Sequence, residues 1–247
     1  MATAIVTGAT SGLGIDIARR LASDGFDVIV TGRNVERGRA VAESIGDRAH
    51  FVQADLTEAG AADRVVQAAL SATGRIDVLV NNAGMDYNAP LEQAPVAEIR
   101  HLFETNSIAP IVMAQAAAAQ MIAQGEGGSI INITSRLASI GVPEMGLYSA
   151  SKGALKSFTT AAAVEWAPHS IRVNSVAPGM ARTEMFDDWL ETFDDGAAKE
   201  REVSAAIPLG RVAEPADVAH AVSYLASPGA AYITGGNIPV DGGYTAK

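Results

Sequence analysis

Cysteine is absent from the chain. Its absence excludes disulfides, thiolate nucleophiles and cysteine-ligated zinc, and it fits a reducing compartment, so a cytoplasmic location is expected. The histidines show no HExxH spacing, and we therefore expect no metal site. They are His50, His101, His169 and His220.

Long apolar runs and an excess of basic residues are also missing. No segment approaches the roughly 20 apolar residues of a membrane span, and the apolar residues 1–7 have no basic flank of the kind found in a signal peptide. The formal net charge is −10, whereas phosphate recognition needs clustered Lys and Arg. We expect neither a membrane nor a nucleic acid as a partner.

Short β-rich runs do alternate with helical patterns along the 247 residues. This alternation predicts an α/β fold: a single Rossmann-type doubly wound domain, residues 1–247, with a mostly parallel seven-stranded sheet flanked by helices. The expected strands are Ala4–Thr7, Val28–Thr31, His50–Gln53, Val78–Asn81, Ser129–Thr134, Ile171–Val176 and Ile238–Val240.

Polar residues and prolines predict the helix boundaries. Thr57 is a candidate N-cap, and Pro95 and Pro215 are candidate first residues of helices. Pro110 is expected to bend or break its helix, and Pro168 to end an alanine-rich helix over residues 154–167.

A glycine-rich segment, Thr7–Gly14 with the sequence TGATSGLG, lies where the first strand turns into the first helix. At this place a pyrophosphate can rest on the positive end of the helix, because glycines let the backbone approach closely. The alternative is a turn that only connects strand and helix. The sequence has neither a glycine-rich loop ending in Lys-Ser or Lys-Thr nor a Gly-x-Ser-x-Gly motif, which disfavours a triphosphatase and a hydrolase.

Tyr148 and Lys152 are four residues apart at the start of the long helix, so that they share one face. A phenol needs a pKa shift of roughly two to three units to exchange protons near neutrality, and a neighbouring ammonium can contribute to it. Taken alone, this spacing also fits a packed aromatic beside a solvated charge.

Three further polar positions surround this pair in the predicted sheet. Ser135 follows one strand and Asn81–Gly84 ends another, at the edge where open α/β sheets bind ligands. Asn106 occupies an unfavourable mid-helix position. It either serves the site or satisfies a local kink with its own side chain.

Together these motifs resemble the short-chain dehydrogenase/reductase family over nearly the whole chain. The resemblance is carried by TGATSGLG at Thr7–Gly14, NNAG at Asn81–Gly84, Asn106, Ser135 with the Tyr148–Lys152 group, and Pro178-Gly179 followed by Thr183.

The resemblance implies an NAD(P)-dependent oxidoreductase that moves a hydride between nicotinamide and a small carbonyl or alcohol. Tyr148 would protonate the carbonyl, and Ser135 would hold its oxygen. Lys152 would bind the nicotinamide ribose and lower the pKa of Tyr148, while Asn106 would position a relay water. The implied cofactor contacts are Gly8, Thr10, Ser11, Gly12, Leu13, Gly14, Arg33, Asp55, Leu56, Asn82, Ala83, Gly84, Tyr148, Lys152, Pro178, Gly179 and Thr183.

Cofactor choice depends on the end of the second strand, where an acid would accept the ribose hydroxyls of NAD. Gly32 stands there, and the adjacent Arg33 can pair with a 2′-phosphate. We therefore expect NADP(H), with NAD(H) as the alternative. Ser11 adds no support, and Arg33 also fits a solvated surface arginine.

Substrate recognition is expected to involve a lid at about residues 182–206, which is acidic but carries apolar side chains that could cover an apolar substrate. A helix with one solvated face explains it equally well. A 3-oxoacyl-carrier-protein-type reductase is the second interpretation, disfavoured because residues 124–127 offer no basic patch. Arg136 either meets a small anion or supports its loop.

Two broader questions stay open from the sequence. The fold also permits a catalytically silent cofactor-binding sensor, although the Ser135, Tyr148 and Lys152 set favours an enzyme. The resemblance implies a homotetramer (or homodimer), and the alanine-rich residues 150–167 fit close packing between subunits. Core burial within one subunit would explain them nearly as well.

Overall fold

A computed structural model describes residues 1–247 and contains one seven-stranded sheet in the order β3-β2-β1-β4-β5-β6-β7. Every neighbouring pair is parallel, which confirms the predicted Rossmann-type fold class. The strands are β1 Thr3–Thr7, β2 Asp27–Gly32, β3 Ala49–Gln53, β4 Val78–Asn81, β5 Gly128–Ile133, β6 Ile171–Pro178 and β7 Asn237–Val240.

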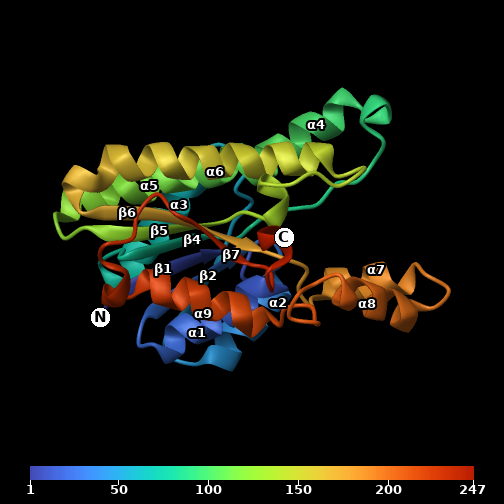
Figure 1. Ribbon diagram of the computed structural model, residues 1–247. Helices are drawn as coiled ribbons and strands as arrows, with labels where there is room; N and C mark the ends of the chain where they lie inside the picture. The colour runs from blue at the N-terminus through green and yellow to red at the C-terminus, as the bar shows by residue number, and fades with distance from the viewer.

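Helices cover both faces of the sheet (Figure 1). On one face, apolar side chains of α1 and α9, such as Ile17 and Val222, pack against strand residues such as Val6. On the other face, α3 and α5 contribute Val65 and Met113 to a second core. The helices are α1 Leu13–Ser23, α2 Val35–Ile45, α3 Ala61–Thr73, α4 Val96–Phe103, α5 Ala109–Gln124, α6 Gly146–Trp166, α7 Glu184–Glu191, α8 Gly196–Ala205 and α9 Pro215–Ala226.

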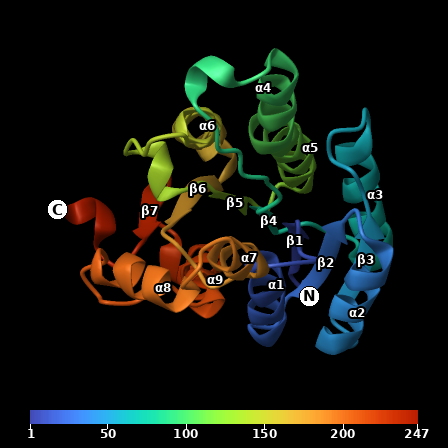
Figure 2. The ribbon, with the colours of Figure 1, turned by 90° about the vertical axis from the view of Figure 1, so that its right-hand side faces the viewer.

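The carboxyl ends of all seven strands meet at one edge, because the strands are parallel. At this edge the chain order reverses between β1 and β4, and such a switch point forms the ligand crevice of open α/β sheets. The α7 and α8 helices project beyond this edge as a separate excursion (Figures 1 and 2). Apolar residues hold it to the body, with Phe186, Ile207 and Val212 forming a third small core.

Two helix predictions are wrong. Thr57 does not cap α3, which begins at Ala61 after Gly60; the Thr57 hydroxyl instead donates to Asp55 at 2.7 Å. Pro110 does not break its helix, because it lies in the first turn of α5, where a missing N–H costs least. A π-helical segment, Glu104–Ile108, joins α4 to α5 just before it.

The long helix also differs from its predicted range. It begins at Gly146 rather than near residue 154, and its regular part ends at Trp166. Pro168 lies in the short 3₁₀ turn that follows. Both Tyr148 and Lys152 therefore belong to the first turns of α6.

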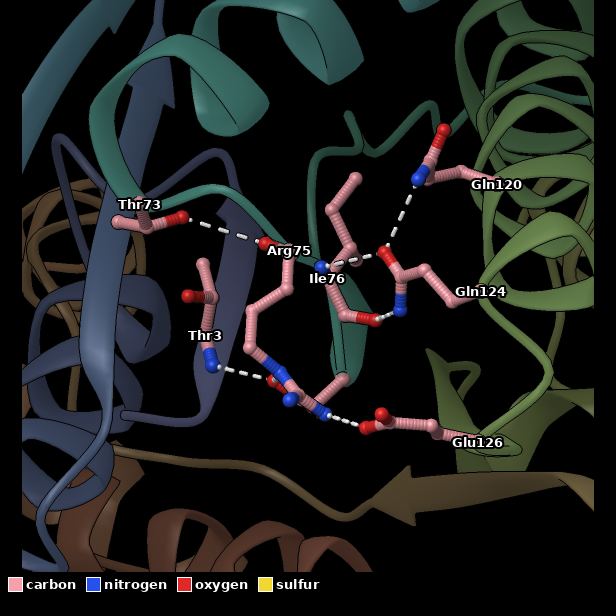
Figure 3. Close-up of polar contacts among 8 residues, drawn as sticks. Thr3, Thr73, Arg75, Ile76, Gln120, Gln124 and Glu126 are labelled. Carbon is pink, nitrogen blue, oxygen red and sulfur yellow. Dashed lines mark hydrogen bonds and ion pairs between the residues drawn. The ribbon is translucent and has the colours of Figure 1, made fainter.

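The amino-terminal edge of the sheet is closed by polar contacts (Figure 3). Arg75 forms ion pairs with Asp77 and, at 2.7 Å, with Glu126, and Asp77 accepts from the Thr3 backbone at 2.7 Å. The Gln124 amide bonds both backbone groups of Ile76, at 2.9 and 3.0 Å. These contacts join β1, β4 and the approach to β5, at the edge away from the crevice. Across the whole chain, every helix is too short or too polar to span a membrane.

Candidate active site

The glycine-rich turn after β1 provides a cradle that side chains would fill. Gly8 has φ +62°, and a Cβ there would lie 2.7 Å from Ala83 Cα. A Cβ on Gly14 would overlap the Gly8 carbonyl oxygen. Gly12 is the N-cap of α1, and no side chain caps the first-turn N–H groups. The N–H groups at the start of α1 are free, and the glycines let a ligand come close to the backbone. This arrangement fits the pyrophosphate of a dinucleotide.

The Thr7 hydroxyl ties this turn to the NNAG segment. It accepts hydrogen bonds from the backbone N–H groups of Asn82 and Ala83, both at 3.0 Å. The Asn82 amide in turn donates to the carbonyl oxygens of Thr7 and Gly8, also at 3.0 Å. The two predicted cofactor segments therefore form one rigid wall. Thr7 opens the motif but is not among the predicted contacts.

The ends of β2 and β3 carry the residues predicted to contact the ribose and the adenine of the cofactor. A Cβ on Gly32 would lie 2.6 Å from the Thr10 methyl group, so Thr10 covers the position where an acidic side chain would begin. Arg33 is exposed and forms no ion pair. Hydrogen bonds from Thr57 lower the pKa of Asp55, and Arg33 adds to this effect. Leu56 packs partly buried against the α3–α5 core.

Asn106 is fully buried in the π-helical segment and binds the backbone that follows NNAG. Its Oδ1 accepts from Met85 N at 2.8 Å, and its Nδ2 donates to Met85 O at 2.7 Å. The same amide donates to Ser151 Oγ at 3.1 Å, and that hydroxyl donates to Tyr148 O at 2.8 Å. Asn106 is therefore linked to α6 through Ser151.

Lys152 reaches the carboxyl end of β5, where its Nζ donates to Ile133 O at 3.0 Å. The side chain is buried, and burial lowers the pKa of Lys152 to about 8. A Cβ on Gly84 would lie 3.1 Å from Lys152 Nζ and 3.2 Å from Asn106 Oδ1. Gly84 thus keeps the space between these two polar groups open.

Tyr148 and Ser135 lie together above the end of β5. Burial raises the pKa of Tyr148 to about 12; the nearby Ser135 hydroxyl opposes this shift, and Asp86 adds to it. The phenol therefore carries its proton at neutral pH. Lys152 Nζ lies 5.9 Å from the centroid of the phenol ring and donates to a backbone carbonyl oxygen, and the expectation that it lowers the pKa of Tyr148 stays a prediction for the cofactor-bound enzyme.

The segment after β6 closes the site from the other side. Pro178 is the last residue of β6, and a Cβ on Gly179 would lie 2.9 Å from Asp241 Cα. Thr183 caps α7 by accepting from Phe186 N at 3.3 Å. Its methyl group lies 3.7 Å from where a Gly12 Cβ would be, so this segment lies beside the glycine-rich turn.

The structure thus brings the predicted residues to one edge of the sheet, with the Asn106, Ser135, Tyr148 and Lys152 group at one end and Arg33 at the other. Leu13 begins α1, and Thr10 and Ser11 lie in the turn before it. Three contributors escaped prediction. The Met85 backbone lies outside every motif, the Ser151 hydroxyl has no role assigned to it within the Tyr148–Lys152 group, and an ion pair from Arg37 to Glu184, at 3.0 Å, depends on tertiary placement alone.

A family profile described as enoyl-(acyl carrier protein) reductase matches residues 8–245 of the chain. The chain belongs to the short-chain dehydrogenase/reductase family. As a member of this family, it is an NAD(P)-dependent oxidoreductase.

Relatives in this family align over almost the full chain. A diacetyl reductase [(S)-acetoin forming] from Staphylococcus epidermidis is 40% identical and covers 98% of this chain and 97% of its own. An NADP-dependent (R)-specific alcohol dehydrogenase from Lentilactobacillus kefiri is 35% identical, with 99% and 96% covered. The crystal structure of acetoin dehydrogenase from Enterobacter cloacae superposes with a TM-score of 0.88 at 36% identity, covering 99% and 96%.

Proposed function

We propose that this short-chain dehydrogenase/reductase reduces a small ketone with NADPH and that Tyr148 donates the proton. The observation that carries the proposal is geometric: Tyr148, half-buried in the first turns of α6, lies beside Ser135 at the carboxyl edge of the sheet, with buried Lys152 one turn further along the same helix. The phenol is protonated in the ligand-free chain, and we propose that the Lys152 ammonium and the bound cofactor bring its pKa down toward neutrality, so that it can pass its proton to a carbonyl oxygen.

The proposed reaction assigns one task to each polar side chain. A nicotinamide held at this edge of the sheet would supply the hydride that the carbonyl carbon accepts. Tyr148 Oη gives its proton to the carbonyl oxygen, and Ser135 Oγ holds that oxygen by a hydrogen bond. Lys152 would hold the ribose of the cofactor. Asn106 fixes the Met85 backbone by two hydrogen bonds, and we assign to it the positioning of the relay water. In the reverse direction, Tyr148 must first lose its proton, which its raised pKa disfavours.

A preference for NADP(H) is supported by Arg33. This side chain is exposed beside the end of β2 and has no acidic partner within ion-pair distance, so that it is free to meet a 2′-phosphate. Position 32 is a glycine and not an acidic residue, and the Thr10 side chain fills the space where an acidic side chain would begin. One relative is named as NADP-dependent. NAD(H) remains the alternative that a binding measurement would reveal.

A small substrate is supported by the names of the relatives, among them a diacetyl reductase and a cyclopentanol dehydrogenase. The α7–α8 excursion is the proposed lid, with Phe186 and Trp189 toward its own core. An acyl carrier protein is acidic, and the lid carries Asp188, Glu191 and Asp194 on its exposed surface. Like charges disfavour that partner, despite the description of the family profile.

The test is a comparison of substrates at equal concentration, following the loss of reduced nicotinamide by absorbance. We expect NADPH oxidation with diacetyl or another small ketone, and little with a 3-oxoacyl thioester. Faster turnover of the thioester would favour the acyl reductase. If NADPH binds but no carbonyl compound is reduced, the chain is a cofactor-binding sensor instead.

A further inference from the structure

Arg136 directly follows Ser135, and its guanidinium group makes no hydrogen bond or ion pair. It lies in the 3₁₀ turn Arg136–Ala138, with its guanidinium carbon 4.0 Å from the ring centroid of Tyr244. Its Nη1 is buried and makes no hydrogen bond. Its backbone continues from Ser135, and Tyr244, on which the guanidinium stacks, packs against the core of the α7–α8 excursion, so the charge lies on the side of the site that the proposed lid covers.

Arg172, another half-buried arginine, shows which hydrogen bonds Arg136 lacks. Arg172 donates through Nη2 to Leu225 O at 2.7 Å and through Nη1 to Ile233 O at 3.5 Å. Arg136 makes no such bond, and none of the ion pairs in the structure includes it. The two arginines are similarly buried, but the protein provides hydrogen-bond acceptors for the guanidinium of Arg172 and none for that of Arg136.

The nearest candidate counter-charge is already occupied. Asp241 contributes to the field at Arg136, but its Oδ1 accepts from Gly243 N at 3.0 Å. Its Oδ2 accepts from Thr245 N at 3.0 Å and from Thr245 Oγ1 at 2.6 Å. Asp241 therefore shapes its own turn and leaves the Arg136 guanidinium without a hydrogen-bonded anion.

A guanidinium nitrogen that is buried without an acceptor is unfavourable, and partial burial lowers the pKa of Arg136. An unsatisfied buried polar atom in a folded protein calls for an explanation, and a bound ligand is one. The planar fork of a guanidinium matches a carboxylate, which accepts two parallel hydrogen bonds. Tyr244 fixes the plane of this fork from one side, since it also packs against the core of the α7–α8 excursion.

We propose that Arg136 binds the carboxylate of the substrate, so that the preferred substrates are small oxo acids and the corresponding hydroxy acids. This inference rests on the proposed reductase function, because it places the carboxylate relative to a carbonyl held by Ser135 and Tyr148. The adjacency of Ser135 and Arg136 requires a compact substrate, whose carboxylate is a few bonds from the reacting carbon.

The experiment compares 2-oxobutanoate, 3-oxobutanoate and 4-oxopentanoate, each with its methyl ester, in the wild type and in Arg136→Met and Arg136→Lys variants. Methionine keeps the length and the apolar contacts of the side chain while removing the charge. For at least one acid we expect KM to rise roughly 10- to 100-fold in Arg136→Met, with a smaller rise in Arg136→Lys. KM for the ester should stay unchanged.

The matched control is Lys156→Gln, which removes a positive charge that contacts the same loop through Ser139, at 2.9 Å. It should leave the ratio of acid to ester unchanged. An equal ratio of kcat/KM for acid and ester in the wild type and Arg136→Met would overturn the carboxylate site. A lower melting temperature in Arg136→Met, with both substrates affected alike, would show that Arg136 only supports its loop.

Thermal stabilisation separates this inference from the reductase function. If an oxo acid stabilises the NADPH-bound wild type but not Arg136→Met, and neither acid nor ester is reduced, the carboxylate site stands while the reductase proposal fails. If esters are reduced and acids are neither preferred nor stabilising, the reductase stands and the carboxylate site is wrong.

Discussion

The Asn106 side chain and the Met85 backbone form a closed pair: Oδ1 accepts from Met85 N at 2.8 Å, and Nδ2 donates to Met85 O at 2.7 Å. Only a primary amide offers an acceptor and a donor in this arrangement. The pair lies beside Lys152, across the bare backbone of Gly84. It therefore determines how the NNAG segment meets α6.

Asn106→Asp should break half of this pair. A carboxylate can still accept from Met85 N, but it cannot donate to Met85 O or to Ser151, and these acceptors stay buried without a donor. We expect the free energy of unfolding to fall by about 1–3 kcal/mol, measured by urea denaturation. The control is Asn88→Asp, the same change at an exposed position. Equal stability of the two variants would show that the pair contributes little.

Lys152 should make stability depend on pH. Its pKa is about 8 in the folded chain, against a model-compound value of 10.5. Between these values the unfolded chain binds the proton and the folded chain does not, so the free energy of unfolding rises with pH, by at most about 1.4 kcal/mol per pH unit. Tyr148 has the opposite effect above pH 10: its pKa is raised from 10.0 to about 12, so the folded chain keeps a proton that the unfolded chain loses, and the free energy of unfolding falls with pH there.

Lys152→Met is the test of this assignment. Urea denaturation between pH 8 and 10 should show a rise in stability for the wild type that is reduced in Lys152→Met and kept in Lys156→Met, which removes a lysine one turn further along α6. A rise of the same size in Lys152→Met would assign the titration to another group.

Tyr148→Phe should abolish proton donation while keeping the ring in place. We expect kcat to fall by roughly 10²–10⁴ and the Kd for NADPH to change little, measured by thermal stabilisation in the absence of substrate. Tyr224→Phe, on α9, is the control; its hydroxyl contacts only Gly229 O, at 3.4 Å. Unaltered turnover in Tyr148→Phe would remove the phenol from the proposed mechanism.

Features set by local spacing could be predicted from the sequence. Tyr148 and Lys152 share a face because they are four residues apart on a helix, and the glycine-rich turn follows a strand as its composition indicates. Alternation of strand and helix patterns was likewise sufficient for the parallel sheet.

Features that depend on distant partners could not be predicted. Thr57 has the composition of an N-cap, but Asp55 accepts its hydrogen bonds and the helix begins after Gly60. The pKa of Tyr148 depends on burial and on where Lys152 points, which a spacing of four residues leaves undetermined. The unpaired state of Arg136 is visible only once every neighbouring acceptor has a position.

Cofactor preference should follow the charge at Arg33. Arg33→Gln should raise the Kd for NADPH by roughly 10- to 100-fold, because a charge-assisted contact to the 2′-phosphate is lost, and leave the Kd for NADH nearly unchanged. Arg39→Gln, an exposed arginine on α2, is the control. Thermal stabilisation by each cofactor measures the effect. Equal losses for both cofactors would contradict a phosphate contact.

Conversion toward NADH requires a second change. Gly32→Asp alone should fold poorly or bind weakly, because its Cβ would lie 2.6 Å from the Thr10 methyl group. With Thr10→Ala the acid can reach the ribose hydroxyls, and we expect the double variant to bind NADH better than NADPH. Retained preference for NADPH in the double variant would mean that the ribose does not lie at the end of β2.

Self-association should depend on α5 and α6. Val164 on α6 is 76% exposed, and Val112 on α5 and Ile108 just before it are 43% and 46% exposed. Apolar side chains exposed on long helices are typical of a face that a second copy covers. We expect light scattering to give the mass of a tetramer or dimer, and Val164→Asp to lower it. Val96→Asp, at an equally apolar but separate exposed site on α4, should leave the mass unchanged; a monomeric wild type would refute the assembly.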